Sequence, residues 1–270
     1  MDDRVKVTMS DGIADVRLVR ADKMNALDAA MFDALVATSG RLAHEKGLRA
    51  VVLSGEGRAF CAGLDMDRFA AMKKGGNRVA GGESRDLTAR THGLANFPQQ
   101  AVWGWRQLPV PVIAAIQGVA FGGGFQLALG ADMRFLAPDA RMSIMEIKWG
   151  LVPDMAGTPI LASLVRDDIL RELTYTGRIF SAQEALSYGL ATRICDDPRA
   201  AAFEVAREIA GKSPEAIRAA KRMLNNLAID PGPALLAESV EQMKLMGGAN
   251  QLEAVRANID KRAPRFVDVG

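Results

Sequence analysis

Two short segments of small residues each follow an apolar run, and their types and spacing suggest a reaction centre. Residues 59–63 (AFCAG) follow the apolar run 50–53, and residues 120–124 (AFGGG) follow the run 112–116. Each pair is typical of a buried strand that ends in a tight turn, because small residues allow a close approach to the backbone. A helix that follows such a turn offers free N–H groups at its start. Two turns at matching register would aim two N–H groups at one oxyanion, as carbonyl chemistry requires.

The elements that must position these turns follow from local patterns. Alternating apolar residues before and after Asp11-Gly12 predict a hairpin, and Asp28 is expected to be the N-cap of an amphipathic helix that ends before Gly47. A buried helix is expected over residues 125–131, and a helix with mobile flanks over 71–107. Further helices are expected after the cap residues Ser181 and Ser213, over 234–246 and over 251–261. The chain therefore predicts strand–helix repeats followed by a helical tail.

Composition argues against several classes of partner. The 34 Lys and Arg residues nearly balance the 32 Asp and Glu residues, so neither nucleic acid nor an anionic membrane is expected as the main partner. The uncharged run 107–131 is long enough to span a bilayer, but its prolines and glycines favour a buried strand, a loop and a core helix. Cys61 and Cys195 fit no disulfide framework, and no signal peptide is recognised, so we expect a cytoplasmic protein. No His, Cys, Asp or Glu spacing suggests a metal site.

The two turns and the segments around them resemble the crotonase (enoyl-CoA hydratase/isomerase) superfamily. The residues that carry the resemblance are FCAGLD at 60–65, PVIAAIQG at 111–118 and GGG at 122–124, and the similarity continues through 141–157. These motifs identify the superfamily more closely than the reaction, because one oxyanion hole serves many chemistries.

The resemblance implies a fold and a substrate class. The expected fold is α/β, a crotonase-like spiral of ββα repeats over residues 1–200 that carries the acyl-CoA site. A helical C-terminal region over residues 201–270 is expected to drive oligomerisation, into a homotrimer or a dimer of trimers. The implied substrate is an acyl-CoA thioester, with coenzyme A as part of the substrate and no further cofactor.

The resemblance also implies roles for individual residues. Ala62 and Gly123 match the two backbone donors to the thioester oxygen. Glu146 matches a catalytic glutamate, and its apolar neighbours would raise its pKa toward neutrality. Asp154 stands where hydratases commonly carry glycine and dienoyl-CoA isomerases carry an aspartate. Gln126 stands where hydratases carry another glutamate and where those isomerases usually carry an acid; it can hold water but cannot transfer a proton.

The same match implies a set of residues that bind the substrate and its coenzyme A portion. They are Lys23, Ala26, Ala62, Gly63, Leu64, Asp65, Gly123 and Gln126. Lys23 and Ala26 belong to a segment that flanks the CoA adenine in the family.

Three functions remain open at this level. The leading hypothesis is isomerisation of a double bond in an enoyl- or dienoyl-CoA through an enolate, with Glu146 moving protons and Asp154 assisting. The second is a 2-enoyl-CoA hydratase in which Glu146 is the sole acid and Gln126 orients water. The third is a non-catalytic CoA-ester binding protein. Aroyl-CoA dehalogenases also carry Asp at position 154, but their Trp at position 146 disfavours that option, and a helix N-cap is the structural alternative for Asp154.

Overall fold

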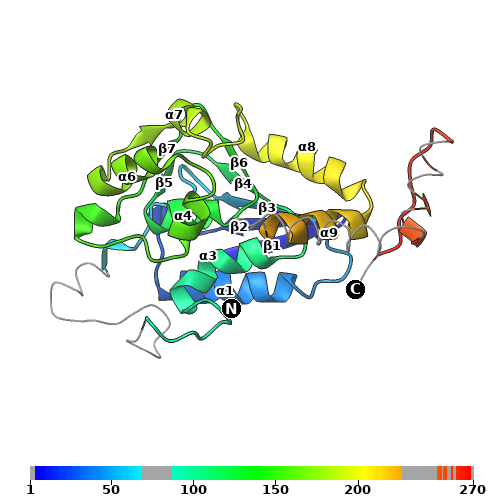
Figure 1. Ribbon diagram of the computed structural model, residues 1–270, viewed down its shortest axis with the longest axis horizontal. Coiled ribbons are helices and arrows are strands. Elements are labelled where there is room, and N and C mark those ends of the chain that lie inside the picture. Colours follow the sequence, from blue (N-terminus) through cyan, green and yellow to red (C-terminus); the bar gives the residue numbers. More distant parts are fainter. Residues whose placement is uncertain are drawn as a thin grey trace.

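A sheet of six strands forms the centre of the structure, which is a computed structural model that describes residues 4–67, 87–226, 248–250, 252–253, 257 and 260–268 (Figure 1). The strands are β1 (Val5–Ser10), β2 (Ile13–Leu18), β3 (Ala50–Gly55), β4 (Val112–Ile116), β5 (Val119–Phe121), β6 (Met133–Leu136), β7 (Arg141–Ser143), β8 (Phe180–Ser181) and β9 (Arg193–Ile194). The helices are η1 (Ala21–Lys23), α1 (Ala29–Leu42), α3 (Phe97–Gln107), α4 (Gly123–Leu129), η2 (Glu146–Trp149), α5 (Gly157–Leu161), α6 (Asp167–Thr176), α7 (Ala182–Ser187), α8 (Pro198–Ala210) and α9 (Pro214–Asn225).

Successive strands are distributed between two sheets in a repeating pattern. The large sheet has the order β1-β2-β3-β4-β6-β9, parallel except for the β1–β2 hairpin, and the small sheet has the order β5-β7-β8. The units β4–β5–α4 and β6–β7–α5 each place one strand in the large sheet and the next in the small sheet before a helix follows. The α/β arrangement of strand–strand–helix repeats is therefore confirmed.

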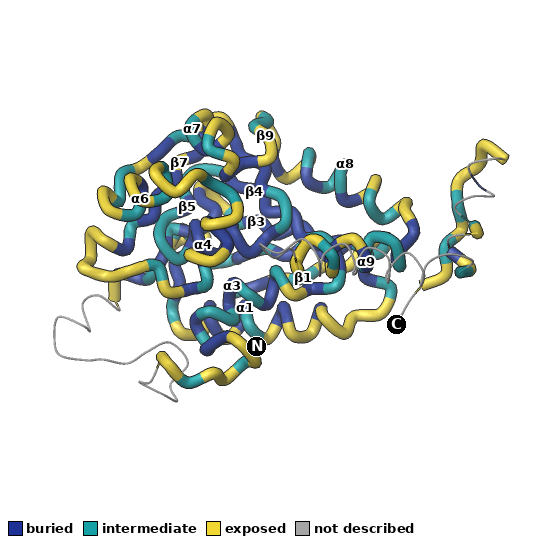
Figure 2. Tube along the Cα trace, viewed as in Figure 1, coloured by how far each residue is buried: buried dark blue, intermediate teal, exposed yellow. Residues whose placement is uncertain are grey.

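The strands β3 and β4 bury both of their faces, and their residues alternate between two hydrophobic clusters. Val51 and Val112 belong to the cluster that includes residues of α1, α3 and α4, whereas Val52 and Ile113 pack with Ala202 and its neighbours on α8. Figure 1 shows α8 on one side of the sheet and α1 and α3 on the other, and Figure 2 shows the strands between them buried. Parallel strands covered on both faces are expected to be almost continuously apolar, as residues 50–53 of β3 and all residues of β4 are.

The local signals for the hairpin and the helix starts are confirmed. Strands β1 and β2 pair antiparallel around Asp11-Gly12. The Asp28 side chain accepts a hydrogen bond from Met31 N at the start of α1, and Ser181 forms a capping box with Glu184 at the start of α7. The Ser213 side chain accepts a hydrogen bond from Ala216 N at the start of α9.

The uncharged run 107–131 folds as β4, β5 and α4 rather than as one long helix. Within the described residues, no helix is both long and apolar enough to cross a membrane. The helix expected over 125–131 begins two residues earlier, so that Gly123 is the first residue of α4. In the stretch 71–107, α3 covers the last part, while residues 68–86 lie outside the described residues.

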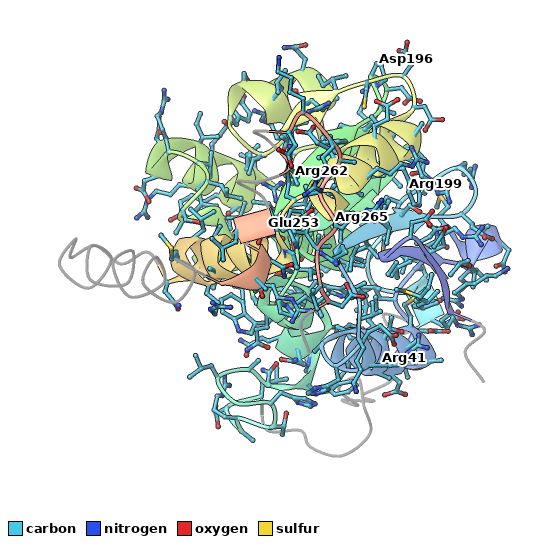
Figure 3. The ribbon with its side chains drawn as sticks, turned by 90° about the vertical axis from the view of Figure 1, so that its right-hand side faces the viewer. Arg41, Asp196, Arg199, Glu253, Arg262 and Arg265 are labelled. Carbon is cyan, nitrogen blue, oxygen red and sulfur yellow. The ribbon has the colours of Figure 1, made fainter. Side chains whose placement is uncertain are left out.

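The C-terminal part of the chain contains the helices α8 and α9, and α8 packs on the large sheet across the expected boundary at residue 200. The helix expected over 234–246 lies outside the described residues, as does most of the one over 251–261. Near the end of the chain, Glu253 accepts hydrogen bonds from the Arg262 guanidinium at 2.6 and 3.0 Å and from Arg265 N at 2.6 Å (Figure 3). The domain boundary and trimer formation stay predictions.

The close approach of Gly124 to the backbone of Cys61 can be tested by comparing alanine substitutions at two helical glycines, Gly124 and Gly40. A Cβ added at Gly124 would lie 2.3 Å from Cys61 O, whereas a Cβ at Gly40 in α1 meets nothing within 4 Å. Helix propensity alone favours alanine at both sites by about 1 kcal/mol. We expect Gly40→Ala to be neutral or stabilising and Gly124→Ala to lower the free energy of unfolding by about 1–3 kcal/mol, as measured by chemical denaturation. Equal effects of the two substitutions would contradict the close approach.

Candidate active site

The two turns singled out from the sequence are hydrogen-bonded directly to each other. Phe60 N donates to Gln117 O at 2.9 Å and Cys61 N donates to Val119 O at 3.1 Å. In return, Phe121 N donates to Cys61 O at 3.1 Å. The segment after β3 therefore pairs in parallel with β5, which fixes the register of one turn against the other.

Glycines make this close approach sterically possible. Gly63 has φ +88°, and a Cβ added there would lie 2.5 Å from Phe121 O and 3.8 Å from Gly123 N. Both the positive φ and the lack of space exclude a larger side chain at this position. Gly63 and Gly123 consequently lie side by side at the ends of the two turns.

The backbone of Ala62 is already engaged within the protein. Ala62 N donates a hydrogen bond to Met24 O at 2.9 Å. An N–H that points at a backbone carbonyl is not available to a substrate oxygen. The prediction that Ala62 supplies an oxyanion donor is therefore wrong for this geometry, because the segment that precedes α1 occupies that N–H.

Leu64, two residues further on, presents an N–H in the opposite direction. Leu27 N donates to Gly63 O at 2.8 Å, and Asp65 N donates to Leu27 O at 3.1 Å. In such a parallel bridge the residue between the two bonded ones turns its own N–H away from the partner strand. Among the described residues, neither Leu64 N nor Gly123 N has a hydrogen-bond acceptor. Leu64 N–H and Gly123 N–H, which come from different turns, are thus both without an acceptor in the described part of the chain.

Glu146 is the buried carboxylate next to the second turn. It opens η2, is 8% exposed, and lies against Gly122, where an added Cβ would be 3.4 Å from Oε1. Its Oε1 accepts a hydrogen bond of 2.6 Å from Gln126 Nε2, while its buried Oε2 has no partner among the described residues. Burial raises the pKa of Glu146, hydrogen bonds from its own backbone N–H and from Gln126 partly oppose this, and the negative charge of Asp154 raises it further.

Asp154 lies close enough to Glu146 for the two charges to interact, but in a different setting. Its side chain is exposed, yet protein crowds its carboxyl sufficiently that desolvation raises its pKa as well. The residue that precedes α5 is Ala156, and the start of α5 has no side-chain cap. The N-cap interpretation of Asp154 is therefore wrong.

Gln126 is 2% exposed and makes three hydrogen bonds inside the protein. Besides donating to Glu146, its Oε1 accepts from Met155 N at 2.9 Å and from Gly157 N at 3.0 Å. The amide thus joins α4 to Glu146 and to the backbone that follows Asp154.

The segment expected to contact CoA lies beside the first turn, and two residues that sequence reasoning missed hold it there. Buried Asn25 donates to Ala59 O at 2.9 Å and accepts from Arg20 N at 2.9 Å. The Arg20 guanidinium forms an ion pair with Asp65 and donates to Ala26 O at 3.0 Å. Asn25 with φ +55° is a local signal of a special turn, whereas the pairing of Arg20 with Asp65 spans 45 residues and has no local signal.

The remaining predicted binding residues divide by exposure. Lys23 is exposed at the end of η1, whereas Ala26 is buried. The Asp65 carboxylate forms an ion pair with Arg20 and accepts a hydrogen bond from Asp67 N, so its side chain stabilises the turn.

Cys61 lies inside the paired turns but is not placed for nucleophilic chemistry. Burial raises the pKa of its thiol to about 12, and its Sγ donates to Asn25 O. In the part of the chain that the structure describes, no three His, Cys, Asp or Glu side chains gather as a metal site.

Comparisons with known proteins identify the family of the chain and its fold. The family described as enoyl-CoA hydratase/isomerase matches residues 8–268. Similar proteins are a carnitinyl-CoA dehydratase of Proteus mirabilis, 32% identical with 98% of this chain and 99% of that protein covered, and a probable enoyl-CoA hydratase of Mycobacterium tuberculosis, 33% identical with 97% and 98% covered. The crystal structure of an enoyl-CoA hydratase from Bacillus anthracis matches with a TM-score of 0.87 and 30% identity over 97% of this chain and 98% of that one. The chain therefore belongs to the enoyl-CoA hydratase/isomerase (crotonase) family of enzymes, which act on CoA thioesters.

Proposed function

We propose that this enzyme isomerises a carbon–carbon double bond in an enoyl- or dienoyl-CoA thioester. The observation that carries the proposal is the pair of carboxyl groups, Glu146 and Asp154, whose charges interact and whose pKa values are both raised. Two carboxyl groups at different depths can remove a proton at one carbon and return one at another. The match to dienoyl-CoA isomerases within the family stays a prediction.

The proposed oxyanion donors are Leu64 N–H and Gly123 N–H. Neither has an acceptor among the described residues, and the lack of a side chain at Gly63 lets the two turns approach closely. An oxygen between these donors would carry the negative charge that develops when the carbon next to the thioester loses a proton. Loss of one such donor typically costs about 3–4 kcal/mol of transition-state stabilisation.

Proton transfer is assigned to Glu146, through Oε2, the oxygen that has no hydrogen-bond partner within the described residues. In a 3-enoyl-CoA, Glu146 takes a proton from C2, the electron pair of that C–H bond delocalises into a dienolate, and a proton returns to C4. The product is a conjugated 2-enoyl-CoA with the same atoms, and no water or further cofactor is consumed. Asp154 is the proposed second carboxyl group, which acts at C4.

Reversible hydration of a 2-enoyl-CoA is the second candidate. The names of relatives favour it, since those proteins are described as a dehydratase and as probable hydratases. This candidate requires Glu146 to act on both water and carbon, because the Gln126 amide cannot transfer a proton. Trimer formation, contacts of CoA with Lys23 and Ala26, and a cytoplasmic location also stay predictions.

A panel of 2-enoyl-, 3-enoyl- and 3,5-dienoyl-CoA esters tests the choice between the two reactions. We expect the wild type to shift the double bond of a 3-enoyl- or 3,5-dienoyl-CoA faster than it hydrates a 2-enoyl-CoA, as measured by absorbance and mass spectrometry. Glu146→Gln should lose about 10²–10⁴-fold in rate, because the amide cannot exchange protons. Glu208→Gln changes an exposed glutamate in α8 and should retain full activity. Rapid hydration by the wild type, together with no effect of Asp154→Asn, would make the isomerase proposal wrong.

The pH dependence of kcat/KM tests the interaction between the two carboxyl groups. Glu146 must be ionised to accept a proton, and its pKa is raised, so the acid limb should lie above the ordinary glutamate value of 4.5. Asp154→Asn removes a nearby negative charge and thereby favours the ionised form of Glu146, so the limb should move to lower pH. Asp139→Asn removes the same charge from an exposed turn after β6 and should leave the limb in place. A limb that stays put or moves upward in Asp154→Asn would contradict the interaction.

A further inference from the structure

The orientation of the Gln126 amide is fixed by its backbone partners. Two N–H groups, from Met155 and Gly157, point at one end of the amide at 2.9 and 3.0 Å. That end must be the oxygen, since an NH₂ group would face two donors. The NH₂ end therefore faces Glu146 Oε1 at 2.6 Å as a donor.

Packing holds the amide in this position. Gln126 is buried within α4, and a Cβ added at Gly157 would lie 2.7 Å from its Oε1 and 2.9 Å from its Cγ. The absence of a side chain at residue 157 is thus what admits the amide between α4 and α5. A buried side chain with three hydrogen bonds has little freedom to rotate toward a substrate or a water.

The amide makes the two oxygens of Glu146 different. Oε1 is committed to Gln126, whereas Oε2 is buried and has no partner among the described residues. A buried carboxylate oxygen without a donor is costly, and such an atom calls for a functional explanation. The same amide also fixes the backbone of Met155, the residue after Asp154.

We propose that Gln126 is a positioning residue that holds Glu146 with Oε2 as the proton-transferring oxygen and couples it to the segment that carries Asp154. Gln126 is a neutral hydrogen-bond donor at a position where related enzymes carry an acid. Glu146 therefore acts alone at C2. Because both lone pairs of its oxygen accept backbone N–H groups, Gln126 cannot accept a hydrogen bond from a reacting water. This inference rests on the proposed role of Glu146 as a base, and it holds for isomerisation and hydration alike.

Exchange of C2 protons in D₂O tests the inference without depending on the choice of reaction. Butyryl-CoA and octanoyl-CoA are saturated, so they can be neither isomerised nor hydrated. Glu146 would remove a C2 proton, exchange it with solvent and return a deuteron, which mass spectrometry detects. Three variants are compared with the wild type across pH: Gln126→Met, Gln126→Glu and, as a control, Gln117→Met. Gln117 also donates its amide to backbone carbonyls, of Gly55 and Gly57, but does not touch Glu146.

Gln126→Met should lower the plateau exchange rate by about 10²-fold, since a misplaced catalytic group commonly costs that much. Its acid limb should also move to higher pH, because the hydrogen bond from Gln126 favours the ionised form of Glu146. Gln126→Glu retains an acceptor for both backbone N–H groups. When the carboxyl groups of residues 126 and 146 hold one proton between them, the protonated group at residue 126 can also donate to Glu146 Oε1. It should therefore exceed Gln126→Met in rate and show a new alkaline limb, where the second proton is lost. Gln117→Met should keep the wild-type rate and limb.

Each outcome separates the two proposals. Gln126→Met with the wild-type rate and acid limb would overturn the positioning role of Gln126 alone. If Gln126→Met does not fold, a Gln126→Glu variant without an alkaline limb would overturn it instead. Absence of exchange by the wild type with both thioesters would contradict the enolate chemistry on which both proposals rest.

Discussion

The direct pairing of the segment after β3 with β5 is the constraint on which the rest of the site depends. Three backbone hydrogen bonds join the two segments, and Gly63 and Gly124 leave no room for a side chain between them. Because the large sheet fixes β3 beside β4, the turns that follow these strands must meet at the same edge. The proposed donors, Leu64 N–H and Gly123 N–H, lie at the ends of these two turns, and Glu146 lies beside the second turn.

The residues around the second turn determine the protonation of Glu146. Gly122 leaves space for the Glu146 carboxyl, and Gln126 supplies it with a neutral donor rather than a second acid. Burial favours the protonated form, while the amide hydrogen bond favours the ionised form. A base whose protonated and ionised forms are both stabilised in this way is suited to taking and returning protons. Asp154, exposed yet crowded, brings a second titrating group within reach of the first.

Local patterns were sufficient to predict most of the fold and part of the site. The hairpin, the caps at Asp28 and Ser181 and the paired turns each have a signal within a few residues of sequence. The choice of Ala62 as a donor was wrong because the direction of its N–H depends on Met24, which is distant in sequence. The amide contacts of Gln126 likewise join residues about 30 positions apart, and no local pattern encodes them. Residue types thus predicted the family and the segments of the candidate site, and long-range pairing decides which backbone atoms in those segments are engaged within the protein.

The central claim is that a thioester oxygen binds between Leu64 N–H and Gly123 N–H, with Glu146 beside the adjacent carbon. A crystal structure of the Glu146→Gln variant with bound 3-enoyl-CoA tests this most directly, since the substitution prevents turnover. We predict that the thioester oxygen lies about 2.7–3.2 Å from both nitrogens, while Ala62 N still donates to Met24 O. A thioester oxygen bound to Ala62 N, or one that contacts neither turn, would contradict the account.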